Sequence, residues 1–278
     1  MVFMMVANLN LKRLKNNVFI SIFILFSSII SNAQELSIIK TVPIKEADKV
    51  TVDRYYNIYI ADTKENIQKY DQEGNYLLTF SPSKPGDISL IEAWNSIRIF
   101  VFYKDFQEFV LLDRFLVAQP NYKIDQNLIG FARSATISSD NQLWVIDDDD
   151  FSLKKYDLDA QKVIINSPLE LILKAKDYHI NFMREYQNQV YLNDRNAGIL
   201  VFDNMGNYKK KLSFTGIDHF SFINDELYYL KDNKIIFFNV YNFSERNINL
   251  PQGFNITKVI VSPEYTYLFS GTNLLICK

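Results

Sequence analysis

The chain has 278 residues, of which 48% are hydrophobic, 15% aromatic and 22% charged, and its formal net charge is −2. That composition excludes an intrinsically disordered protein, and the balanced charge excludes a generally basic surface for nucleic acid. The single cysteine, Cys277, has no partner for an internal disulfide, and two histidines are too few for a histidine-rich metal centre.

Residues 1–33 have the three parts of a secretory signal peptide. Lys12, Arg13 and Lys15 precede a charge-free apolar stretch of thirteen residues at 18–30, and small residues lead up to Ala33. A bilayer span needs about 20 apolar residues, so cleavage near Ala33 is expected in preference to a membrane anchor.

Cleavage would leave residues 34–278 as one exported domain, in the periplasm or outside the cell. The leader contains three basic residues and no acidic one, so the remaining 245 residues carry a net charge of −5. Without disulfides in an oxidising compartment, such a domain depends on its core and on closure of the chain.

A β-hairpin pattern is repeated six times after the leader: an alternating apolar run, a polar turn and a second such run. The copies lie at residues 50–62, 90–102, 135–147, 182–194, 220–232 and 259–270. Aligned on their second strands, successive copies are 37 to 47 residues apart. A period near 40 with several strands per repeat is typical of the blades of a β-propeller.

A third strand is expected after each hairpin, and two of these segments share the pattern Asp-x-x-Gly-Asn. The pattern is complete at Asp71, Gly74 and Asn75, and again at Asp203, Gly206 and Asn207. We expect the aspartate to begin a tight turn, the Gly-Asn pair to supply two positive-φ positions, and a fourth, outer strand to follow.

The last copy has no room for a fourth strand, because only residues 273–277 follow its hairpin. Residues 36–41, ahead of the first copy, form a spare strand. We therefore predict an all-β fold, a six-bladed β-propeller of four-stranded antiparallel blades, closed by an N-terminal strand that completes the C-terminal blade.

The segments VDRYYNIYIAD…IQKYDQEGNY (52–76) and SSDNQLWVID…LKKYDLDA (138–160) resemble the six-bladed β-propellers of the NHL and TolB-like group. The resemblance extends over essentially all of residues 35–278. It implies the propeller fold and leaves function open, because propellers include hydrolases, lyases, sugar binders and docking platforms.

Acidic residues follow the second strand in most copies, which predicts an acidic loop face for a cation or a basic partner. The alternative is ordinary turn chemistry. The residues are Asp62, Asp105, Asp147, Asp148, Asp149, Asp150, Asp194 and Asp232. Ca²⁺ would suit the run 147–150, but no calcium motif surrounds it, so a solvated turn is favoured and no cofactor is predicted.

His179 and His219 each precede a first strand and lie close to Asp177 and Asp218, which makes them weak acid–base candidates. No nucleophile motif accompanies them, so a packing or surface role is favoured. Cys277, in an apolar strand, is expected to be a small buried hydrophobe.

Two insertions lengthen the repeats, at residues 118–130 and 167–176, and the second is expected to be helical. Propeller lactonases hold a metal with Glu, Asn and Asp ligands, and no convincing set aligns here. The recurring asparagines fall at the hairpin turns: Asn57, Asn141, Asn188 and Asn224.

The preferred hypothesis is an exported, non-catalytic propeller that binds another protein, as an accessory factor of an envelope or secretion assembly such as type 9 secretion. It is expected to be monomeric apart from that partner, without nucleic acid or a membrane span. The alternatives are a metal-dependent lactonase or hydrolase in the central channel, and a glycan-binding module.

Overall fold

Twenty-four strands form six four-stranded antiparallel sheets in the computed structural model, which describes residues 36–84, 86–95, 97–174 and 177–278. The predicted signal peptide at 1–33 lies outside the described residues. Within the described ranges, no helix has the length and hydropathy needed to cross a bilayer.

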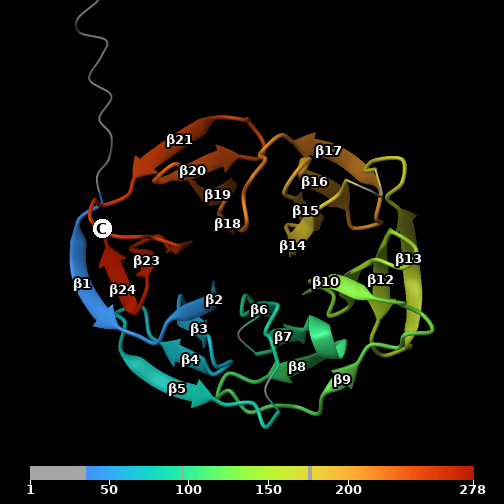
Figure 1. The fold of residues 1–278 in the computed structure, drawn as a ribbon, viewed down its shortest axis with the longest axis horizontal. Coiled ribbons are helices and arrows are strands. Elements are labelled where there is room, and N and C mark those ends of the chain that lie inside the picture. Colours follow the sequence, from blue (N-terminus) through green and yellow to red (C-terminus); the bar gives the residue numbers. More distant parts are fainter. Residues whose placement is uncertain (1–35, 85, 96, 175–176) are drawn as a thin grey trace, which may run out of the picture. The chain divides into compact units, whose positions relative to one another are not determined.

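The sheets are arranged as the blades of a ring, as Figure 1 shows. Blade 1 contains β2 (Ala47–Val52), β3 (Ile58–Asp62), β4 (Ile67–Tyr70) and β5 (Tyr76–Phe80); blade 2 contains β6 (Leu90–Glu92), β7 (Ile99–Tyr103), β8 (Glu108–Leu112) and β9 (Tyr122–Lys123). Blade 3 contains β10 (Ala132–Ile137), β11 (Leu143–Asp147), β12 (Ser152–Asp157) and β13 (Lys162–Pro168); blade 4 contains β14 (Ile180–Tyr186), β15 (Gln189–Asp194), β16 (Gly198–Asp203) and β17 (Tyr208–Leu212). Blade 5 contains β18 (Phe220–Ile223), β19 (Glu226–Lys231), β20 (Lys234–Asn239) and β21 (Glu245–Asn249).

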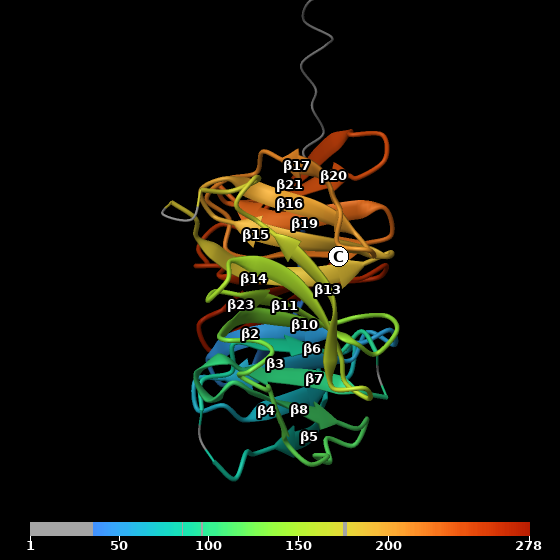
Figure 2. The same ribbon diagram turned by 90° about the vertical axis from the view of Figure 1, so that its right-hand side faces the viewer.

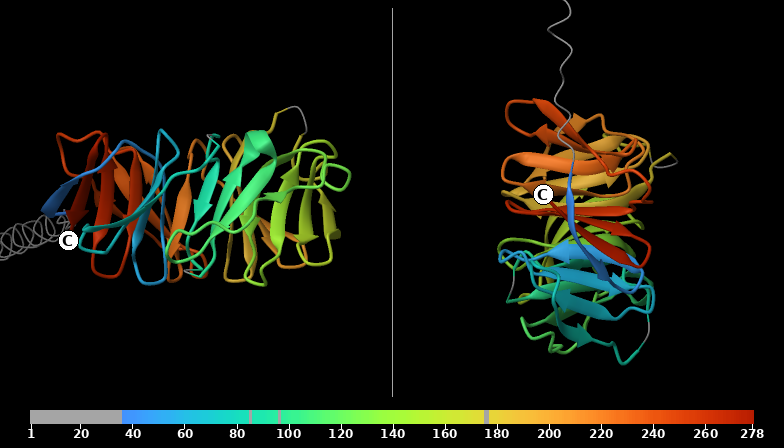
Figure 3. Two further views of the ribbon diagram at one scale, coloured as in Figure 1. Left: turned by 90° about the horizontal axis from the view of Figure 1, so that it is seen from below. Right: turned by 90° about the vertical axis from the view of Figure 1, so that its left-hand side faces the viewer.

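Blade 6 confirms the predicted closure. It contains β22 (Lys258–Val261), β23 (Thr266–Ser270) and β24 (Asn273–Cys277), and its outer strand is β1 (Ile38–Pro43) from the other end of the domain. The blue β1 lies beside the red β24 in Figure 3. The register pairs Ile38 with Cys277 and Val42 with Leu274. Closure therefore covers the edge of β24 with backbone hydrogen bonds.

The Asp-x-x-Gly-Asn segments form five-residue loops, and one detail of the prediction is wrong. In the loop 203–207, Asp203 Oδ1 accepts the backbone N–H groups of Met205 and Asn207, and only Gly206 has a positive φ, of 78°. Asn207 instead donates its side-chain amide to Asp203 at 3.1 Å. Asparagine is needed here because its amide is a donor to the carboxylate rather than because it tolerates a positive φ.

The same loop recurs where the glycine is missing. In the loops 53–57 and 113–117, Tyr56 and Leu116 occupy the glycine position with φ of 61° and 62°, and the leading aspartates accept the same backbone groups. The carboxylate's hydrogen bonds therefore hold a strained residue in place of glycine.

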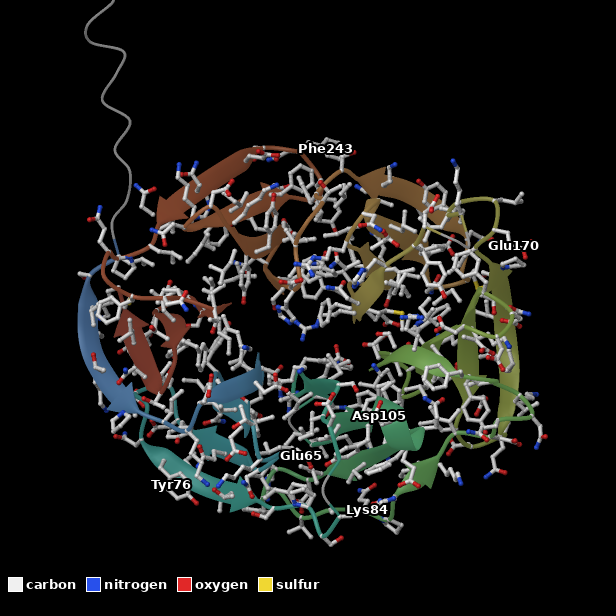
Figure 4. All side chains as sticks on the ribbon, in the orientation of Figure 1. Glu65, Tyr76, Lys84, Asp105, Glu170 and Phe243 are labelled. Atoms are coloured by element: carbon white, nitrogen blue, oxygen red, sulfur yellow. The ribbon has the colours of Figure 1, made fainter. Side chains whose placement is uncertain are left out.

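The core consists of layers of apolar side chains between neighbouring blades, which Figure 4 shows filling the spaces between the sheets. Cys277 is buried among such residues between blades 5 and 6, as predicted. The helix expected at 167–176 is not present in its described part. Leu169 and Leu173 are buried there by turns, and the one helical turn among the described residues is η1 (Lys104–Phe106).

Candidate functional site

The antiparallel blades give the ring two faces with different loops, seen edge-on in Figure 3. One face carries the loops that lead into the first strand of each blade and those that join second and third strands. We call it the approach face. The other carries the loops that join first to second and third to fourth strands, and we call it the turn face. The predicted acidic residues belong to the approach face and the recurring asparagines to the turn face.

Three of the predicted acids, Asp62, Asp147 and Asp194, are buried and bind the backbone of their own blade. Asp147 is 1% exposed, and its two carboxylate oxygens accept the N–H groups of Gly130 and Phe131, each at 3.0 Å. Asp194 is fully buried and accepts the N–H of His179 at 2.7 Å. The carboxylates of Asp147 and Asp194 therefore each fix the loop that leads into the first strand of their blade.

Asp62 occupies the same position in blade 1 and is 3% exposed. It accepts the N–H groups of Lys64 and Asn66 and lies 3.5 Å from the ammonium of Lys45. Asp105, on η1, and Asp232, in a two-residue turn, are exposed; Asp105 is labelled in Figure 4.

Two basic side chains pair with three of the four acids in the run 147–150. The ammonium of the buried Lys154 lies 2.7 Å from both Asp147 and Asp150, and Arg133 lies 2.5 Å from Asp148. Burial raises the pKa of Asp147, but Lys154 and three backbone N–H groups lower it by more, so its pKa is below the ordinary value of 3.8. Among the described residues, no group of three or more His, Cys, Asp or Glu side chains is placed to hold a metal ion.

The two histidines line the approach-face mouth of the central channel in adjoining cavities. His179 borders a cavity of about 290 Å³ together with Lys104 and Arg133. His219 borders one of about 460 Å³, and its ring packs 4.3 Å from that of Phe182. The structure thus places both histidines at one mouth, and neither Asp177 nor Asp218 forms a hydrogen bond with their rings within the described chain.

A polar network inside the channel was not anticipated from the sequence. The buried Glu92 of β6 accepts the hydroxyl of Thr136 at 2.6 Å and the guanidinium of Arg184 at 3.1 Å, and Arg184 also donates to Ser221 at 2.8 Å. These four residues come from the first strands of blades 2, 3, 4 and 5. Glu92 and Arg184 are 92 residues apart in the sequence, so their contact depends on the arrangement of the blades in a ring rather than on a local sequence pattern.

Arginine and aromatic side chains gather on the turn face of blades 1 and 2, whose strands β2–β3 and β6–β8 lie side by side in Figures 1 and 2. We call this the arginine–aromatic surface and define it by six exposed residues: Arg54, Tyr55, Trp94, Ile97, Arg114 and Phe115. The guanidinium carbon of Arg54 lies 5.1 Å from the ring centre of Tyr55, and that of Arg114 lies 4.8 Å from that of Phe115. The sequence signal was the repeated Asp-Arg-aromatic start of the loops 53–57 and 113–117.

The two loops are joined beneath this surface. Tyr59 donates to Asp53 at 3.1 Å, the ammonium of Lys69 lies 5.3 Å from the ring centre of Tyr59, and Lys69 also donates to the carbonyl of Arg114 at 3.0 Å. Tyr59 belongs to one buried cluster with Ala93, which begins the loop between β6 and β7, and with Leu116 of the loop 113–117. The loops that carry the exposed side chains are therefore anchored on a buried hydrophobic cluster.

No protein-family model matches the sequence, and no curated protein matches it. Solved structures share the fold. Virginiamycin B lyase from Staphylococcus aureus matches with a TM-score of 0.60 at 8% identity, over 88% of this chain and 99% of that one. BamB from Moraxella catarrhalis matches with a TM-score of 0.53 at 8% identity, over 88% and 98%. YCF48 bound to a D1 peptide matches with a TM-score of 0.53 at 10% identity, over 86% and 96%. At these identities the likeness concerns the fold alone.

Proposed function

We propose that this chain is a propeller that binds another protein through the arginine–aromatic surface. The observation that carries the proposal is the exposure of Tyr55, Trp94 and Phe115 beside Arg54 and Arg114, above one buried cluster, with the exposed Arg98 on the loop of Trp94. Tyrosine, tryptophan and arginine are the residues most enriched among the energetic centres of protein interfaces. Exposed apolar side chains grouped in this way are typical of interaction sites.

The partner is expected to present acidic side chains. Arg54, Arg98 and Arg114 are exposed on the three loops, while Asp53 and Asp113 use their carboxylates to bind backbone N–H groups of their own loops. The surface therefore carries positive charge that its own acids do not pair. Acidic groups on a partner would complement it, and added salt would weaken the encounter.

The proposal also includes the cellular location, the propeller group and the assembly that this chain serves. The leader at 1–33 supports export to the periplasm or beyond, and the repeat pattern supports a place in the NHL and TolB-like group. The peptide bound to YCF48 supports peptide recognition by this fold. We propose a monomer, without cofactor, that serves as an accessory factor of an envelope or secretion assembly.

The test is affinity purification from the native envelope followed by mass spectrometry, comparing the wild type with two double variants. Arg54→Ala with Tyr55→Ala should remove the specific partner. Tyr208→Ala with Lys209→Ala, a matched exposed pair on β17, should retain it. Retention of every specific protein by the first variant contradicts the proposal.

Two other outcomes would assign a different function. Binding to a glycan array that is lost with Tyr55→Ala would favour the glycan-binding alternative, because sugars stack on exposed aromatic rings. Hydrolytic activity that is lost on treatment with EDTA would favour the metal-dependent hydrolase.

A further inference from the structure

The channel cavity at the approach face is large enough for a small molecule and is built by five blades. Its volume of about 460 Å³ lies within the range of small-molecule sites. Residues from blades 1, 2, 4, 5 and 6 line it, including Lys49, Phe182, His219, Tyr229 and Lys258. The arginine–aromatic surface is on the opposite face, so this site is separate from the proposed protein-binding function.

Basic side chains line this cavity from three blades: Lys49, His219 and Lys258. Lys258 and His219 have no hydrogen-bond or ion-pair partner for their side chains within the described parts of the chain. The two acids that also line the cavity are engaged: Asp48 lies 2.6 Å from Lys49, and Asp218 lies 3.2 Å from Arg195. Lys258 and His219 can therefore donate hydrogen bonds to an anion, because the neighbouring carboxylates of Asp48 and Asp218 are already paired with other side chains.

Burial and nearby positive charges act in the same direction on the pKa of His219. Enclosure by the ring lowers the pKa of His219 well below its ordinary value of 6.5, and the positive charges of Arg184, Lys258 and Lys49 lower it further. His219 is itself an exposed residue at the rim of this cavity. The other charged or titratable groups of this lining are Asp48 on β2, Asp218 beside His219, and Tyr228 and Tyr229 on β19.

The pKa of Lys258 is also lowered. Burial lowers the pKa of its ammonium and Lys49 lowers it too, while Asp48 and Glu46 raise it by less than the sum of these effects. A bound anion would raise the pKa of both side chains, because an opposite charge favours their protonated forms.

We propose that this cavity binds a small organic anion, with its carboxylate or phosphate group between Lys258 and His219 and its apolar part against Phe182 and Tyr229. Charge-assisted hydrogen bonds would hold the anionic group, and the aromatic rings would cover the remainder. A bound anion would raise the pKa of His219, so affinity increases as the pH falls.

Isothermal titration calorimetry of the purified chain with benzoate and with phenyl phosphate tests the proposal and distinguishes the two anionic groups. The wild type should bind at least one of them saturably and with proton uptake, seen as a dependence of the heat on the ionisation enthalpy of the buffer. Lys258→Met should weaken binding by about tenfold or more, the loss expected for a charged hydrogen bond. His219→Gln should reduce the proton uptake.

Lys64→Met is the matched control, since it removes an exposed approach-face lysine that does not line the cavity. It should leave the affinity unchanged within about twofold. Circular dichroism melting of each variant checks that it is folded. Absence of saturable binding to either compound up to about 1 mM overturns the proposal. Equal weakening by Lys258→Met and Lys64→Met also overturns it, because the effect would then be non-specific.

Discussion

The carboxylates at the ends of the second strands show how one residue type supports the architecture. Asp147 and Asp194 are among the most buried polar groups of the chain, and each binds the loop that leads into its own first strand. Their burial is tolerated because backbone N–H groups and, for Asp147, the ammonium of Lys154 satisfy both oxygens.

Replacing Asp147 with asparagine should lower the free energy of unfolding by about 1.5–3 kcal/mol, because Lys154 and the N–H groups of Gly130 and Phe131 lose a charged acceptor, while Lys154 keeps Asp150. The folded pKa of Asp147 is lowered, so its contribution is fully present above its ordinary pKa of 3.8 and is lost as the pH falls through the lower folded value. Urea denaturation at pH 7 and below pH 4 measures both effects. Asp105→Asn, at an exposed position, should change stability by no more than about 0.5 kcal/mol.

At the scale of elements, the five-residue loop is the most repeated unit of the turn face. Its leading aspartate and positive-φ fourth residue recur with Gly74, Gly206, Tyr56 and Leu116 in that fourth position. The fourth position of this loop accepts a non-glycine residue where there is space for a side chain. At Gly206 there is no such space. A Cβ at Gly206 would lie 2.5 Å from Ser167 Oγ and 2.7 Å from Ile165 Cγ2.

Gly206→Ala should therefore destabilise the protein by more than the backbone strain of about 1–2 kcal/mol that alanine meets at a positive φ. Gly253→Ala separates the two effects, because Gly253 has a φ of 85° and no atom within 4 Å of the added Cβ. Thermal melting of both variants measures the difference. Equal losses would mean that the contact with blade 3 does not matter.

Strand β1 is the second element with a testable role. A chain that begins at residue 46 lacks β1 and exposes the edge of β24, with Leu274 and Ile276 losing their cover. An open hydrophobic edge strand pairs with other chains, so this variant should melt at a lower temperature and self-associate. A chain that begins at residue 36 is the comparison. Light scattering and thermal melting would contradict the closure role if the two chains behaved alike.

At the scale of the whole molecule, the Glu92–Arg184 network joins four blades across the channel. Burial raises the pKa of Glu92, while Arg184, the hydroxyl of Thr136 and the N–H of Ile137 lower it; burial prevails and the pKa is raised. We therefore expect the network to contribute to the specific arrangement of the blades and to add little to the free energy of unfolding.

Arg184→Met alone should cost about 3–5 kcal/mol, because it leaves Glu92 buried without its counter-ion. Combining it with Glu92→Met should recover most of that loss, since two apolar side chains replace the pair. A double-mutant cycle from urea denaturation measures the coupling. The loss from Arg184→Met should shrink as the pH falls, because a protonated Glu92 needs no counter-ion. Additive effects of the two substitutions would contradict the coupling.

The sequence alone determined the six hairpins, the four-stranded blades and the N-terminal closing strand, because strand alternation and a period near 40 are local properties that repeat. It also indicated the tight turns at Asp71 and Asp203, whose hydrogen bonds lie within five residues. Tertiary structure decided which polar residues meet. Glu92 and Arg184 pair, Lys258 and His219 share a cavity, and the loops of Arg54 and Arg114 adjoin, only because the ring brings distant first strands and neighbouring blades together.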